Sequence, residues 1–173
     1  TLKKWEVATG RVLRTIADTG WGGVLWCGVS PDGRWVISTS LLGSVHLWEA
    51  SSGLKVHNLV SPTHGKCAVS PDGKLLVAAS SMEHDGTVAM IETETNLTLH
   101  TLLGHTERVL GCAVSPDGRW VITASHDMTL RVWEADTGCE RLVIALLGKL
   151  SGVGLHPWLP LVTCGDEVGG VYF

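Results

Sequence analysis

The side chains that could carry acid–base or metal chemistry are histidines and carboxylates scattered along the chain. Eight histidines occur among the 173 residues, and none shows the HxH or HExxH spacing that places two imidazoles on one metal ion. The best candidates for catalysis are His64, His84, Asp85 and Asp166, but they do not recur at matching positions. GxSxG, phosphate-loop and paired-carboxylate patterns are also missing from the sequence. We therefore predict no catalytic residue, no metal site and no cofactor.

The cysteines follow the same spacing as a repeated tetrapeptide. Cys27, Cys67 and Cys112 each lie three residues before a Ser-Pro-Asp-Gly sequence. The total of five is odd, and no CxxC pair occurs, so neither a disulfide framework nor a zinc site is expected. We predict reduced thiols that behave as small buried hydrophobic side chains, which favours a cytoplasmic protein.

Ser-Pro-Asp-Gly occurs three times, at 30–33, 70–73 and 115–118, so its starts lie 40 and 45 residues apart. A degenerate fourth copy begins at His156. Periods of about 40 to 45 residues indicate stacked repeats or propeller blades.

The third copy shows what each repeat contains. Apolar or β-branched runs at 109–114, 119–124, 129–133 and 140–146 alternate with turn sequences, of which 115–118 is the first. Proline and glycine in that turn preset its backbone geometry. Four short antiparallel strands in about 40 residues are typical of a propeller blade.

The sequence thus predicts an all-β fold, a β-propeller of four-stranded antiparallel blades with about four repeats. The expected ring is partial, a half-propeller, because four blades fall at the low end of closed rings. The alternative is a four-bladed closure in which Arg11–Ile16 supplies the fourth strand of the last unit. The expected boundaries are 1–16 for the end of a preceding blade, 17–59 for repeat 1, 60–102 for repeat 2, 103–146 for repeat 3 and 147–173 for an incomplete repeat 4.

On these motifs the chain resembles the WD-repeat β-propellers over essentially its whole length. Gly104-His105 matches the Gly-His pair that precedes the first strand of a repeat. Trp133-Glu134 and Trp48-Glu49 are close variants of the Trp-Asp pair that closes the third strand. The resemblance implies a protein-interaction or ligand-sensing scaffold without catalytic activity.

The resemblance also implies a hydrogen-bonded network inside a blade, formed by a histidine, a hydroxyl, an aspartate and a tryptophan. The third repeat alone supplies all four, as His105, Ser125 (or Thr123), Asp127 and Trp133. A buried polar network of this kind stabilises the fold, so His105 and Asp127 are not expected to form a catalytic dyad.

The last repeat, with its paired glycines at 169–170, resembles the terminal blade of bacterial WD-repeat propellers attached to STAND ATPases of the NB-ARC or NACHT type. In those proteins the propeller is a sensor that holds the ATPase inactive until a ligand or foreign protein docks. The resemblance implies a larger cytosolic bacterial signalling protein, whose nucleotide-binding residues would lie outside this chain.

Departures from the repeat mark the expected binding loops. Trp21 lies between flexible glycines, and an insertion of about three residues places Glu83 and His84 in a lengthened turn. The net charge of −4 and scattered basic residues give no general affinity for nucleic acid, and no apolar run could span a membrane. We expect protein partners on the end faces of the propeller, and further blades from the same polypeptide or a second copy. The alternatives are a catalytic propeller with a site at the channel mouth, or an isolated fragment that assembles into a full ring.

Overall fold

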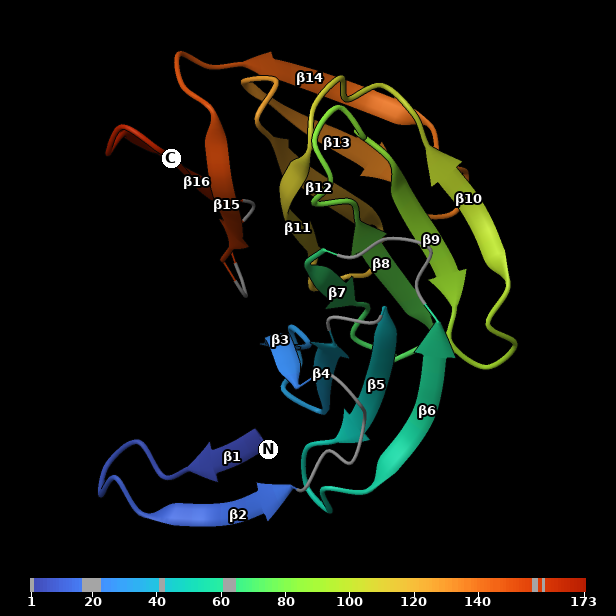
Figure 1. The fold of residues 1–173 in the computed structure, drawn as a ribbon, viewed down its shortest axis with the longest axis vertical. Coiled ribbons are helices and arrows are strands. Elements are labelled where there is room, and N and C mark those ends of the chain that lie inside the picture. The colour runs from blue at the N-terminus through green and yellow to red at the C-terminus, as the bar shows by residue number, and fades with distance from the viewer. Residues whose placement is uncertain (1, 17–22, 41–42, 61–64, 157–158, 160) are drawn as a thin grey trace.

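The computed structural model describes residues 2–16, 23–40, 43–60, 65–156, 159 and 161–173. This part of the chain consists of short strands joined by turns and contains no helix. The expected all-β fold is confirmed (Figure 1).

The strands form five antiparallel sheets that follow one another in chain order. A hairpin at the N-terminal end consists of β1 (Leu2–Trp5) and β2 (Val12–Ile16). Blade 1 contains β3 (Val24–Val29), β4 (Trp35–Ser40), β5 (Ser44–Glu49) and β6 (Lys55–Val60). Blade 2 contains β7 (Cys67–Val69), β8 (Leu75–Ala79), β9 (Val88–Glu92) and β10 (Thr98–Leu102). Blade 3 contains β11 (Val109–Val114), β12 (Trp120–Ser125), β13 (Thr129–Glu134) and β14 (Glu140–Ala145). Blade 4 has three strands, β15 (Leu150–Leu155), β16 (Val162–Asp166) and β17 (Val171–Tyr172).

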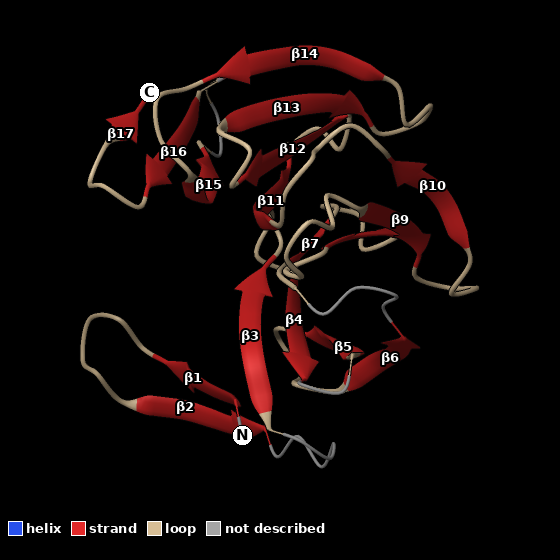
Figure 2. Ribbon diagram, turned by 45° about the horizontal axis from the view of Figure 1, so that its top comes forward, coloured by secondary structure: helices blue, strands red, loops and turns tan. Residues whose placement is uncertain are grey.

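The blades are arranged around a common centre as in a β-propeller. The first strand of each blade lies innermost, and the fourth strand of blades 1 to 3 lies at the rim (Figures 1 and 2). The hairpin and blade 4 are the two ends of this arc, and they lie apart in both views. The alternative closure is not formed, because β2 pairs with β1 from Leu2↔Ile16 onward and the described sheet of blade 4 contains β15, β16 and β17 alone.

Each Ser-Pro-Asp-Gly turn is stabilised by its own side chains. In blade 2, Ser70 Oγ donates to Asp72 Oδ1 at 2.6 Å and accepts from the Leu75 amide at 2.9 Å. Gly73 has φ +76°, a conformation that favours glycine. The other two copies repeat the pair of hydrogen bonds, so the turn starts the second strand at the same place in every repeat.

The hydrophobic core lies between the blades. One cluster joins Ile37 and Leu47 of blade 1 to Leu76 and Ile91 of blade 2. A second cluster joins blade 2 to blade 3, and its largest member is the buried indole of Trp133. A third joins blade 3 to blade 4. Blades 2 and 3 are therefore apolar on both faces, and each of these faces is covered by a neighbouring blade.

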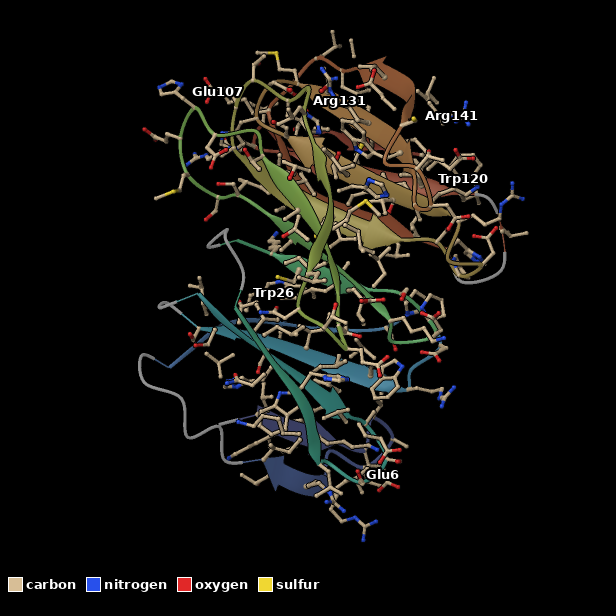
Figure 3. All side chains as sticks on the ribbon, turned by 90° about the vertical axis from the view of Figure 1, so that its right-hand side faces the viewer. Glu6, Trp26, Glu107, Trp120, Arg131 and Arg141 are labelled. Carbon is tan, nitrogen blue, oxygen red and sulfur yellow. The ribbon has the colours of Figure 1, made fainter. Side chains whose placement is uncertain are left out.

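The antiparallel order gives every blade two different ends. The turns after the first and third strands lie at one end, called here the turn end, and the remaining connections lie at the other, the loop end. Figure 3 shows this separation, with Glu107 at the loop end and Glu6, Trp120 and Arg141 toward the turn end.

Two tryptophans at the same repeat position, Trp133 in β13 and Trp5 in β1, provide a stability test. Trp133 is 2% exposed, whereas Trp5 is 52% exposed at the same repeat position. Replacing Trp133 with alanine should lower the free energy of unfolding by about 3 to 5 kcal/mol, because it empties a packed core site. Trp5→Ala is the matched control and should cost less than about 1 kcal/mol. Urea denaturation measures both, and similar losses would contradict the assigned core.

Candidate functional site

The polar network inside blade 3 joins side chains from three segments of the chain. His105 Nδ1 lies 2.8 Å from Asp127 Oδ2, and His105 Nε2 lies 2.7 Å from Thr123 Oγ1. The Trp133 indole N–H donates to the same Thr123 oxygen at 2.9 Å. The network therefore links the loop before β11, strand β12 with the turn that follows it, and strand β13.

The hydroxyl of this network belongs to Thr123, the alternative to Ser125. Ser125 instead accepts from the Asp127 amide at 3.1 Å, and its Oγ lies 3.0 Å from the carbonyl oxygens of Glu107 and Arg108. The preference for Ser125 was wrong in this detail: the indole N–H reaches the threonine two residues earlier on the same side of β12. In blade 1, Trp48 Nε1 makes the equivalent bond to Ser38 at 3.0 Å.

Burial decides the charge state of His105, whose side chain is fully inaccessible to solvent. Desolvation lowers the pKa of His105, and this effect outweighs the attraction of Asp127. The imidazole is thus held neutral and enclosed, where no substrate can reach it. We assign His105, Asp127, Thr123 and Trp133 a structural role.

The inserted turn of blade 2 projects at the loop end. His84 has φ +58° and an 81% exposed side chain whose Nδ1 lies 2.9 Å from Glu107 Oε1. Glu83 is 75% exposed, with Oε1 3.8 Å from Arg108 Nη1. Desolvation alone would raise the pKa of Glu107, but its hydrogen bonds with His84 lower it. The insertion of blade 2 is therefore tied to blade 3 while its polar atoms face solvent.

These contacts continue from blade 3 to blade 4. Arg108 Nε donates to His126 Nδ1 at 3.0 Å, and His126 Nε2 lies 2.9 Å from Glu167 Oε1. His126 is almost completely buried, while Glu167 is about half exposed. We call Glu83, His84, Glu107, Arg108, His126 and Glu167 the loop-end network.

The binding candidates predicted from the sequence have different outcomes. Glu83 and His84 lie in the loop-end network, whereas Trp21 falls outside the described residues. Sequence reasoning missed Glu107, Arg108 and Glu167. For Glu107 and Arg108 the signal was their position in the loop of the next blade, at the same end as the insertion, whereas no sequence signal indicated Glu167.

Two of the residues considered for catalysis, Asp85 and Asp166, form hydrogen bonds within their own blades. Asp85 accepts from Ser80 Oγ at 2.7 Å, and Asp166 accepts from the Tyr172 hydroxyl at 2.8 Å. His64 lies outside the described residues. Within the described ranges no group of three or more histidine, cysteine, aspartate or glutamate side chains could hold a metal ion.

The three equivalent cysteines differ in burial. Cys67 is buried and Cys112 is half-buried, but Cys27 is exposed. The expectation of three buried thiols was therefore wrong for Cys27, whose strand β3 belongs to blade 1 and alternates between half-buried and exposed side chains. None of the described segments is a helix that could cross a membrane.

Comparison with known protein families gives three matches to the repeat called "WD domain, G-beta repeat". They cover residues 10–49, 55–91 and 96–134, more than half of the chain. The chain belongs to the WD-repeat family. Propellers of this family are generally non-catalytic scaffolds.

Several curated proteins are similar to the chain. "Meiotic recombination protein rec14" of Schizosaccharomyces pombe is 30% identical over 64% of the chain and 36% of its own length. "Nuclear distribution protein nudF" of Aspergillus niger is 26% identical over 93% of the chain and 40% of its own length. A guanine nucleotide-binding protein subunit beta-1 of Homarus americanus is 32% identical over 78% of the chain and 40% of its own length. The chain thus spans about two fifths or less of these relatives, all of them eukaryotic.

The neutral, buried His105 predicts a pH dependence of stability. The pKa of His105 in the folded chain lies below the ordinary value of 6.5. As the pH falls below 6.5, the unfolded chain therefore binds a proton at this residue while the folded chain does not. Stability should therefore decrease between pH 7.5 and 5.5, and His105→Gln should make this decrease smaller. Thermal unfolding at the two pH values measures the effect. An equal decrease in the variant would rule out His105 as a source.

Proposed function

We propose that this WD-repeat segment is a non-catalytic protein-interaction scaffold whose partner contacts the loop end of blades 2 to 4. The observation that carries the proposal is the loop-end network, in which an exposed insertion is anchored to the two following blades.

The anchoring matters because binding is stronger when the surface is already ordered. A flexible loop loses conformational entropy on binding, whereas His84 and Glu83 have part of their freedom removed by Glu107 and Arg108. The exposed carboxylate of Glu83 and the exposed imidazole of His84 can select a partner with complementary charge and hydrogen-bonding groups. Blade strands provide the rigid support below.

The relatives support the coarse class of this function. The Homarus americanus protein is named as a subunit of a guanine nucleotide-binding protein, so it works within an assembly. We further propose that the chain is a sensor attached to a STAND ATPase in a bacterial cytoplasm, and this proposal rests on the sequence resemblance alone. We also propose that further blades pack against the hairpin β1–β2 and against blade 4, because apolar side chains are exposed at both places. Trp5 in the hairpin is 52% exposed, and Phe173, directly after β17, is 91% exposed.

A double substitution tests the proposed binding surface. Glu83→Ala/His84→Ala should leave folding intact, because both side chains are largely exposed. A partner captured by the unaltered chain and then purified should bind the variant at least about tenfold more weakly, a loss of about 1.4 kcal/mol. Isothermal titration calorimetry measures the affinity.

Glu94→Ala is the matched control, since Glu94 is an exposed carboxylate in the turn that follows β9 at the turn end. It should leave the affinity unchanged. Equal affinity of the double variant and the unaltered chain would remove the insertion from the binding surface.

A further inference from the structure

A hollow of about 550 Å³ lies between blades 2 and 3 at the turn end. Its lining includes Leu75 at the start of β8 and Gly118 in the facing turn of blade 3. On the outer side His100 reaches across from β10, and its Nε2 lies 3.1 Å from the Asp136 carbonyl oxygen. The hollow is at the opposite end of the blades from the loop-end network.

The hollow exists because one repeat lacks a tryptophan. Trp35, Leu75 and Trp120 occupy the same repeat position, two residues after the glycine of each turn. Each faces the next blade along the chain, as their packing against the three successive inter-blade clusters shows.

Blade 1 shows what an aromatic ring does at this position. The indole of Trp35 lies across Gly73 of blade 2, so close that a Cβ on that glycine would be 2.5 Å from Trp35 Cε2. At the next interface Leu75 is too short to cover the corresponding glycine, Gly118. The nearest atom to a Cβ on Gly118 would be Pro71 Cδ at 3.9 Å. The place that an indole fills between blades 1 and 2 is therefore open between blades 2 and 3.

The lining of this hollow carries more negative than positive charge. The backbone amide of Arg119 and the hydroxyl of Ser115 both donate to Asp117 Oδ1, at 3.0 and 2.5 Å. These hydrogen bonds lower the pKa of Asp117, so its carboxylate stays ionised at neutral pH. The charged groups of the lining are Asp72, Glu92, Asp117 and Asp136 against Lys74 and Arg119.

We propose that this hollow is a second binding site, which takes an aromatic side chain of a protein partner flanked by basic residues. An indole over Gly118 would repeat the intramolecular packing of Trp35 on Gly73. A large aromatic ring is also the side chain that contributes most as an anchor in a preformed pocket. The excess of carboxylates favours cationic neighbours of that ring.

A short peptide tests the site without knowledge of the natural partner. Acetyl-Lys-Trp-Lys-amide should bind the 173-residue chain and shift the amide resonances of Leu75 and Gly118 in ¹H–¹⁵N spectra. Acetyl-Glu-Trp-Glu-amide should bind at least about tenfold more weakly, and acetyl-Lys-Ala-Lys-amide should leave both resonances in place. Binding of the alanine peptide with the same shifts would overturn the aromatic assignment. Shifts confined to other residues would overturn the site.

Two substitutions should move the hollow from the interface between blades 2 and 3 to the interface between blades 1 and 2: one fills the existing hollow, and the other opens a new one. Leu75→Trp should fill the hollow from within and weaken binding of the Lys-Trp-Lys peptide at least about tenfold, while raising the melting temperature. Trp35→Leu should open a matched hollow over Gly73, so that the peptide also shifts the amide resonances of Arg34 and Glu49, the counterparts in blade 1 of Lys74 and Glu92. An unchanged affinity in Leu75→Trp would contradict the proposal. If that variant does not fold, the absence of shifts at Arg34 and Glu49 in Trp35→Leu would contradict it independently. Both peptide outcomes are separable from the loop-end proposal, because Glu83→Ala/His84→Ala should leave peptide binding unchanged.

Discussion

The constraint on which the structure depends is that every blade is a thin sheet with two apolar faces. A blade of four short strands buries little by itself, so its stability comes from the neighbours that cover both faces. Blade 2 satisfies this condition on both sides: Leu76 and Ile91 pack toward blade 1, and Val77 and Met90 pack toward blade 3. The hairpin β1–β2, by contrast, is mostly exposed along both strands.

This packing leaves the two ends of the blades available for binding. Strand positions are occupied by core side chains, so variation that would unfold a blade interior can be accommodated in the connections. Blades 2 and 3 contribute to both candidate surfaces, one at each end. The loop-end network results from an insertion whose polar side chains contact the next blade. The hollow at the turn end results from Leu75, which stands where the other repeats have a tryptophan ring. Each site is a local departure from a repeat that is otherwise regular.

The repeat made most of the fold predictable from the sequence. The predicted run 109–114 is strand β11 itself, and the strands that follow begin and end within one residue of the prediction. This success has a local cause, because the Ser-Pro-Asp-Gly turn holds its own geometry through the bonds of Ser70 and Asp72 and their counterparts. The choice between Thr123 and Ser125 was not predictable in the same way. Both face the same side of one strand, and only the structure shows that the indole N–H of Trp133 donates to the threonine.

Contacts between blades were also beyond the sequence. His126 and Glu167 lie about 40 residues apart, and nothing in their local sequence indicates that their side chains meet. The repeat alignment places Trp35, Leu75 and Trp120 at one position. However, the hollow beside Leu75 could be predicted only once the structure showed that this position faces blade 3.

Native-state hydrogen exchange would test the dependence on neighbouring blades most directly. If inter-blade packing supplies the stability, amides of β8, β9 and β12 should exchange most slowly, since their side chains are almost entirely buried. Amides of β1 and β2 should exchange fastest among the strands. Uniform protection across the hairpin and all four blades would contradict this view, because it would mean that a blade needs no neighbour to be stable.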